Sequence, residues 1–299
     1  MPAKKKSVSV SLVLGSGGAR GLAHIGIIRW LEENNYKIES ISGCSAGAII
    51  GGVYAAGKLD VFEEWAKEIT TLDIVTLLDV SWGRGGFVKG DRFINELVGL
   101  VGDQQIEDLP IRFTAVAADI REGKEIWLRD GGLFDAIRAS ISLPLLFQPF
   151  HYRGMNLIDG GVLNPVPIAP TFGDTTDLTI AVNLNSNRGM SHVAEPPKVE
   201  TEAKSSSIRA KISNYLEELQ ESFGRRDTEQ PEEYGVNEIA FQAFDAMQST
   251  IARQKLAAYP PDRVIHIHRR TCRMLEFNRA AEMIELGYRR AGECLAEGE

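Results

Sequence analysis

The sequence predicts an α/β fold with a mainly parallel central sheet and a largely helical C-terminal portion. Two glycine-rich turns near the start each follow a strand-like run and open a helical one, a pattern typical of parallel strands joined by helices. An almost continuous apolar run at 111–120 is typical of a strand covered on both faces. Helical periodicity dominates the last third. The 299 residues, 43% hydrophobic and 25% charged, suffice for one large α/β domain or two small ones.

The first strand is predicted at residues 8–14, and a glycine-rich loop at 15–21 leads from it into a helix that runs to about residue 34. A dinucleotide or P-loop site is the obvious alternative for such a loop. The spacing disfavours both, because G-x-G-x-x-G needs a glycine at position 20 and no Gly-Lys-Ser/Thr follows. What remains is a turn whose backbone N–H groups can bind a negatively charged oxygen, such as the oxyanion of a transition state.

The second turn, residues 42–47, fits G-x-S-x-G with Ser45 at its centre. It lies between a strand at about 38–41 and a helix at 46–57. A serine at such a junction sits on a sharp turn with its hydroxyl exposed at the end of a sheet, although an ordinary strand-to-helix turn fits the same residues. With a right-handed crossover, both turns lie at the carboxyl ends of neighbouring parallel strands, where ligands of open sheets bind.

The stretch from 61 to 109 is mostly helical in pattern, with a glycine-rich interruption at 81–87 that contains Trp82 and Phe87. One interpretation is a lid within 77–90, an apolar flap over a substrate groove that touches membranes transiently. The other is a surface loop held by two buried aromatic side chains. Beyond the buried strand at 111–120, the pattern predicts a strand at 125–129 and a helix at 132–142 that Pro144 ends.

A strand that begins at Met155 brings Asp159 to its end, directly before Gly160 and Gly161. Aspartate before two glycines is usually a turn former that accepts a hydrogen bond from its own backbone. Here a second role is open, because the serine at the end of another strand needs a base.

The C-terminal part follows one more apolar strand at 178–184. The predicted organisation is a basic N-terminal tail at 1–6, a core at 7–185, a flexible linker or loop at 186–205 and a helical portion at 206–299 packed on the core. Within that portion we expect helices at 206–226, 236–258 and 275–295, and a strand at 263–268. The second of these helices has an apolar face that is expected to pack on the core, formed by Val236, Ala240, Ala243, Phe244, Met247 and Ile251.

Composition excludes several classes of function. The net charge of −8 and the lack of a lysine and arginine stripe argue against nucleic-acid binding. Cys44, Cys272 and Cys294 are too few and too scattered for a disulfide framework or a zinc site, which indicates a reducing, cytoplasmic setting. No run approaches the roughly 20 apolar residues of a membrane span. No metal or cofactor is expected.

Ser45 becomes a nucleophile when a neighbour accepts its proton. None of the five histidines stands beside a glycine turn, so each is more easily explained as structural. A Ser-Asp-His triad is still possible with Asp159 and either His266 or His268. Alternatively, Asp159 acts directly as the base, which requires burial beside the serine and away from cations, because free aspartate has a pKa of about 3.9.

Three motifs in order carry a resemblance: Gly17-Gly18-Ala19-Arg20-Gly21, Gly43-Cys44-Ser45-Ala46-Gly47 and Asp159-Gly160-Gly161. Together with Arg138-Ala139-Ser140, Pro144, Phe147, Pro149 and Asn164-Pro165, they resemble the patatin-like phospholipase family over about residues 7–185, and its bacterial stand-alone members above all.

The resemblance implies a three-layer α/β/α sandwich and a serine acyl-ester hydrolase, phospholipase A-like or lysophospholipase-like, that releases fatty acids from lipids. It implies a catalytic dyad with Ser45 as nucleophile and Asp159 as base. The oxyanion hole would comprise Gly17, Gly18, Ala19 and Arg20, and the motifs would be supported by Gly15, Gly21, Gly43, Gly47, Gly160 and Gly161. Ser16 departs from the family pattern, since many members have glycine there. A non-catalytic lipid-binding or adaptor protein with the same fold is the alternative from another class.

Overall fold

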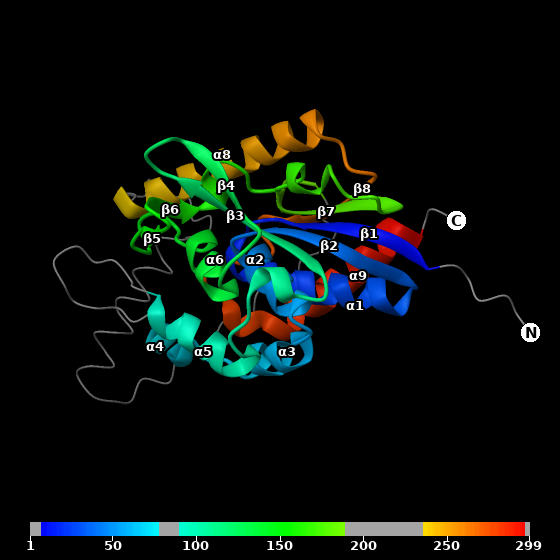
Figure 1. The fold of residues 1–299 in the computed structure, drawn as a ribbon, viewed down its shortest axis with the longest axis horizontal. Coiled ribbons are helices and arrows are strands. Elements are labelled where there is room, and N and C mark those ends of the chain that lie inside the picture. Colours follow the sequence, from blue (N-terminus) through cyan, green and yellow to red (C-terminus); the bar gives the residue numbers. More distant parts are fainter. Residues whose placement is uncertain (1–6, 78–89, 189–235, 297–299) are drawn as a thin grey trace, which may run out of the picture.

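A computed structural model gives the fold and describes residues 7–77, 90–188 and 236–296 (Figure 1). The interruption at 81–87, the expected helix at 206–226 and nearly all of the predicted linker lie outside the described residues.

The described residues form an eight-stranded sheet in the order β5-β6-β3-β2-β1-β7-β8, with β4 also paired to β3. Parallel pairings join β3, β2, β1, β7 and β8, and antiparallel pairings attach β4, β6 and β5. The mainly parallel sheet is therefore confirmed. The strands are β1 (Val8–Leu14), β2 (Tyr36–Cys44), β3 (Arg112–Asp119), β4 (Lys124–Leu128), β5 (Phe150–Tyr152), β6 (Met155–Asp159), β7 (Leu178–Ser186) and β8 (Arg263–His268).

Helices cover both faces of this sheet, as Figure 1 shows: α8 lies on one side, and α1, α2 and α9 lie on the other. This is the expected three-layer arrangement. The helices are α1 (Ala23–Glu33), α2 (Ala46–Ala55), α3 (Leu59–Glu68), α4 (Thr71–Leu77), α5 (Asp91–Val101), α6 (Leu133–Ser140), α8 (Val236–Ala258) and α9 (Ala280–Leu295).

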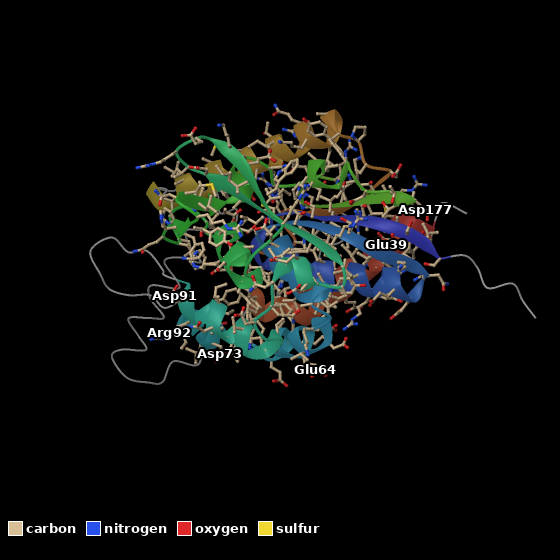
Figure 2. The ribbon with its side chains drawn as sticks, viewed as in Figure 1. Glu39, Glu64, Asp73, Asp91, Arg92 and Asp177 are labelled. Atoms are coloured by element: carbon tan, nitrogen blue, oxygen red, sulfur yellow. The ribbon has the colours of Figure 1, made fainter. Side chains whose placement is uncertain are left out.

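Many charged side chains lie at the periphery of these layers, while Arg20, Arg138, Asp119 and Asp159 are buried. Figure 2 shows Glu64, Asp73 and Asp91 on the outside of the α3–α5 helices. Asp177 lies at the end of the sheet where the parallel strands begin, because its carboxylate accepts a hydrogen bond from the Ser9 N–H of β1 (2.9 Å). The opposite end, where those strands finish, holds the glycine-rich turns. None of the described helices is long and apolar enough to cross a membrane.

Several element boundaries differ from expectation. Strand β2 begins at Tyr36, and β7 continues through Ser186, so the strand includes the first residue of the predicted linker. The last helix begins at Ala280, because a short 3₁₀ turn at Phe277–Arg279 precedes it. The short strand β5 was not predicted; it pairs with β6 through a turn in which Arg153 has φ 49° and Gly154 has φ 78°.

The predicted packing face of α8 is only partly correct: Phe244 packs against a buried apolar cluster, but other members of that face are exposed. Met247 is 55% exposed and Ala243 is exposed, whereas Gln248 is 2% exposed and Ala252 is fully buried. The side chain of Val236 lies outside the described ones. The reason for the error is that the inward face of α8 carries polar side chains that hydrogen-bond to loops, so apolar periodicity does not mark it.

Helices α1 and α9 pack against each other at two glycines. A Cβ atom on Gly26 would overlap the Ile284 carbonyl oxygen, and a Cβ atom on Gly287 would overlap that of Ala23. Both contacts are with backbone atoms, which cannot move aside as a flexible side chain can. The close approach of the last helix to the first therefore depends on two residues without side chains.

We expect Gly26→Ala and Gly287→Ala each to lower the free energy of unfolding by about 1–3 kcal/mol, because an added methyl group overpacks the interface. Gly99→Ala on α5 is the matched control, since nothing lies within 4 Å of its added Cβ. That substitution is expected to stabilise by up to about 1 kcal/mol through helix propensity. Urea unfolding checks all three, and equal effects at the three positions would contradict the close packing.

Candidate active site

The sheet brings the three motif turns to one end of its parallel strands. Leu14 at the end of β1 pairs with Gly43 of β2, so the loop at 15–21 and the turn at Ser45 start side by side. Strand β3 connects Asp159 to them, because Val116 pairs with Cys44 and its neighbour Ala117 pairs with Asp159.

Ser45 occupies a strained turn between β2 and α2. Its backbone has φ 55° and ψ −122°, a left-handed conformation that costs a non-glycine residue about 1–3 kcal/mol. The turn is held because the Ser45 N–H donates to Ser140 Oγ (2.9 Å), whose hydroxyl donates to the Val116 carbonyl (2.7 Å). Gly47 adds to this geometry, since a Cβ there would overlap the Leu14 carbonyl. The predicted strand-to-helix elbow is therefore present in its strained form.

Asp159 is 1% exposed at the end of β6. Its Oδ1 accepts the Gly161 N–H (2.7 Å) and lies 3.7 Å from the Cys44 thiol sulfur. Burial raises the pKa of Asp159 to about 6, and the Ser45 hydroxyl, the Gly161 N–H and the Cys44 thiol oppose part of that rise. No cation among the described residues contributes. Asp159 is therefore buried and away from the described cations, as a direct base requires.

The Ser45 hydroxyl lies near enough to the Asp159 carboxyl group to lower its pKa. Within the described part of the chain, however, Asp159 Oδ2 accepts no hydrogen bond of ordinary geometry. The Ser45 hydroxyl and the Asp159 carboxyl group are therefore neighbours that are not tightly bonded. Catalytic hydrogen bonds of this kind often shorten only in the complex with substrate.

The loop that follows β1 presents two glycine N–H groups. Among the described residues, no acceptor is found for the N–H of Gly17 or Gly18. Gly18 has φ 58°, which favours glycine, and a Cβ there would lie 2.5 Å from atoms of Met274. Gly18 lines the same cavity as Ser45 and Asp159, and the role of the two N–H groups as oxyanion donors stays a prediction.

Ala19 and Arg20 differ from their expected roles. The Ala19 N–H is already taken, because it donates to the Met274 carbonyl (2.8 Å). The Arg20 side chain is 4% exposed and contacts Asp245 (3.2 Å) and the Gly17 carbonyl (3.1 Å). The charge of Arg20 is therefore balanced by the Asp245 carboxylate, and its side chain supports the loop through the Gly17 carbonyl.

The histidines of a possible triad lie elsewhere. His268 Nδ1 accepts the Arg270 N–H (3.1 Å), and burial together with nearby arginines lowers the pKa of both His266 and His268. In the described part of the chain, no hydrogen bond joins either histidine to Ser45 or Asp159, and neither lines the cavity. His24 is fully buried with Nε2 on the Gly15 carbonyl (2.9 Å), and burial lowers its pKa to about 4, so it supports the first loop as a neutral ring.

A cavity of about 130 Å³ opens beside Ser45 and Asp159. Its lining is apolar except near the motifs, where Ser16 and Gln248 join the serine and the aspartate. Sequence reasoning missed Gln248, because a glutamine within a helix carries no motif. The apolar wall includes Ile50, Phe62, Trp65, Phe93, Phe147 and Leu275.

An elbow serine beside a buried carboxylate and an apolar cavity is the arrangement of a serine hydrolase. Residues 12–172 match the family model described as patatin-like phospholipase. The chain therefore belongs to the patatin-like phospholipase family, and this membership supports lipid hydrolase activity in general.

The relatives agree with this assignment. An uncharacterized NTE family protein of Mycobacterium tuberculosis strain H37Rv is 40% identical over 331 aligned residues, which cover 97% of this chain and 92% of the relative. Mouse patatin-like phospholipase domain-containing protein 6 is 33% identical over 194 residues, covering 61% of this chain and 14% of the mouse protein. The crystal structure of VipD from Legionella pneumophila has the same fold, with a TM-score of 0.58, 15% identity and coverage of 98% of this chain and 67% of VipD.

The raised pKa of Asp159 predicts a stability effect. Between pH 4 and pH 6 the folded state binds more protons than the unfolded state, so the carboxyl group lowers stability as the pH rises through this window. The shift from 3.8 to about 6 corresponds to about 3 kcal/mol. We expect Asp159→Asn to be more stable than wild type by up to that amount at pH 8 and about equally stable at pH 4, measured by urea unfolding.

Asp73→Asn is the control for this experiment. Hydrogen bonds from Thr70 lower the pKa of this exposed carboxyl group, so its replacement removes a favourable charged form and brings no gain at high pH. A difference between Asp159→Asn and wild type that stays constant from pH 4 to pH 8 would contradict the raised pKa.

Proposed function

We propose that the protein is a serine acyl-ester hydrolase that releases fatty acids from lipids through a Ser-Asp dyad. The observation that carries the proposal is Ser45 on a strained elbow beside Asp159, at an apolar cavity. Asp159 is a buried carboxylate that has no cationic partner among the described residues. Family membership supports the reaction class. Phospholipase A-like or lysophospholipase-like action belongs to the proposal, as does a cytoplasmic location with transient membrane contact.

In the acylation step, Ser45 Oγ attacks the carbonyl carbon of the ester while its proton passes to the Asp159 carboxylate. The carbonyl oxygen becomes an oxyanion that accepts hydrogen bonds from the Gly17 and Gly18 N–H groups. When the tetrahedral intermediate collapses, the bond from the carbonyl carbon to the alcohol oxygen breaks. Asp159 returns its proton to that oxygen, and the acyl group stays on Ser45.

Deacylation repeats these steps with water. Asp159, ionised again, accepts a proton from the attacking water, and the same two N–H groups stabilise the second oxyanion. Collapse releases the carboxylic acid, and Asp159 gives the proton back to Ser45 Oγ. No other general base is needed, provided that the carboxyl group has a pKa near the working pH.

The cavity supports a hydrocarbon substrate. An apolar cavity of roughly 150 Å³ in a protein accepts a molecule the size of benzene, and the cavity of about 130 Å³ beside Ser45 is of the same order. Each methylene group buried there contributes about 0.8 kcal/mol. An acyl chain is therefore the part of the substrate that this wall would hold. Comparing lipid products formed by wild type and Ser45→Ala would identify the head group and acyl length.

The dyad predicts which substitutions remove activity on a short acyl ester. Ser45→Ala and Asp159→Asn are each expected to lower kcat by about 10³-fold or more, because nucleophile and base are lost. His266→Ala and His268→Ala are the controls and should stay within about threefold of wild type. Substantial activity in Asp159→Asn, or collapse in a histidine variant, would overturn the dyad. A folded protein whose Ser45 does not react with a fluorophosphonate probe would favour the non-catalytic alternative.

The pH dependence gives an independent test of the base. Asp159 accepts a proton only when ionised, so kcat/KM should rise tenfold per pH unit below a pKa of about 6 and level off above it. Steady-state rates between pH 4.5 and 8.5 check this. A profile whose inflection moves in His266→Ala or His268→Ala would instead assign the base to a histidine.

A further inference from the structure

Three polar side chains project from one face of α8 toward the loop that follows β1. They are Asp245, Gln248 and Ser249, spaced three and four residues apart so that they share one side of the helix. Each contacts the loop or a residue that holds it. These polar side chains explain why the apolar pattern of α8 did not identify its inward face.

Two of these side chains act on carbonyl groups of the loop through intermediaries. Asp245 pairs with Arg20 (3.2 Å), whose Nε donates to the Gly17 carbonyl (3.1 Å). Ser249 Oγ donates to the backbone carbonyl of Asn185 (3.0 Å), and the Asn185 side-chain amide donates to the Ser16 carbonyl (3.0 Å). Both loop carbonyls are therefore held by contacts that lead back to α8.

Holding these carbonyls fixes the direction of the N–H groups. In a trans peptide the C=O of one residue and the N–H of the next lie in one plane and point in opposite directions. The Ser16 carbonyl shares its peptide plane with the Gly17 N–H, and the Gly17 carbonyl shares its plane with the Gly18 N–H. Contacts that originate on α8 thus help to fix the direction of the two proposed oxyanion donors.

Gln248 acts on the same loop directly. Its Nε2 donates to Ser16 Oγ (3.2 Å), and it packs so closely on Gly161 that a Cβ at that glycine would overlap it. The same Cβ would lie 3.0 Å from Asp159 Oδ1. One side chain from the C-terminal portion therefore touches both the oxyanion loop and the turn after the aspartate.

Gln248 is poorly explained as a stabilising residue. It is 2% exposed, and within the described part of the chain its Oε1 has no hydrogen-bond partner. A buried amide oxygen without a partner costs free energy in folding. The contacts of Gln248 with Ser16 and Gly161 therefore explain its presence better than a gain in stability does.

We propose that Asp245 and Gln248 of α8 are positioning residues for the loop that carries the Gly17 and Gly18 N–H groups, so that the C-terminal portion helps to form the oxyanion hole. Asp245 acts through Arg20 on the Gly17 carbonyl, and Gln248 acts through the Ser16 hydroxyl. This inference rests on the proposed function. It predicts that loss of either side chain impairs stabilisation of the oxyanion more than it impairs binding of the acyl chain.

The test uses Gln248→Leu and Asp245→Asn in the full chain, with Met247→Gln as the control on the exposed face of α8. We expect kcat to fall about 10- to 100-fold in the first two variants, as for other residues that orient catalytic groups, with KM within about threefold. Affinity for an acyl trifluoromethyl ketone, which forms a tetrahedral oxyanion on the serine, should weaken by a similar factor. Met247→Gln should change none of these values.

Thermal stability separates positioning from packing. Gln248→Leu removes the unpartnered amide and should keep or raise the melting temperature while activity falls, whereas a packing role predicts lower stability with unchanged kcat per folded molecule. Asp245→Glu should restore part of the activity lost in Asp245→Asn. If Asp245→Asn does not fold, Gln248→Leu alone decides.

Ser45→Ala distinguishes the two proposals. If that variant is inactive while Gln248→Leu and Asp245→Asn match wild type in kcat and in ketone affinity, the positioning role is overturned and the proposed function stands. If Ser45→Ala keeps full activity, the proposed function itself fails.

Discussion

The site depends on one buried carboxylate, Asp159, beside which the described part of the chain places no cation. Desolvation is the largest influence on Asp159 and moves its pKa upward, while a backbone N–H and two neighbouring side chains keep the charged form within reach. A lysine or arginine next to Asp159 would lower the pKa of the Asp159 carboxyl group and make it a weak base. The surrounding structure therefore has to be apolar and closely packed, which the sheet, the α2 helix and the cavity wall provide.

Several costly features surround this carboxylate. Ser45 has a left-handed backbone, and the side chains of Asp159, Gln248 and Asn164 each have a buried oxygen without a partner in the described part of the chain. Strained and unsatisfied groups persist where the rest of the fold holds them in place, and they gather at functional sites. Here the support comes from the parallel strands β1, β2 and β3. Their register places all three motif turns at the carboxyl ends of these strands.

Local patterns in the sequence predicted most of the sheet and the elbow, because apolar runs and glycine-rich turns act through neighbouring residues. They did not predict the direction of the Arg20 side chain, which is set by Asp245, more than two hundred residues away. They also failed on α8, where Met247 continues an apolar period yet faces outward and Gln248 faces in. Periodicity reports which side of a helix is apolar, and it cannot show that a helix buries polar groups against a loop whose carbonyls need donors.

On the proposed mechanism, burial lets an aspartate do what histidine does in a Ser-His-Asp triad. Free histidine has a pKa of about 6.5 and free aspartate one of about 3.9, and burial brings Asp159 to about 6. The pKa of the base therefore reaches the useful range by desolvation, in place of an imidazole oriented by a carboxylate. Orientation comes instead from Gly161, whose N–H holds Oδ1, and from Gln248 packed on that glycine. Because the same glutamine contacts Ser16, base and oxyanion loop share one support, and a shift of α8 would displace both together.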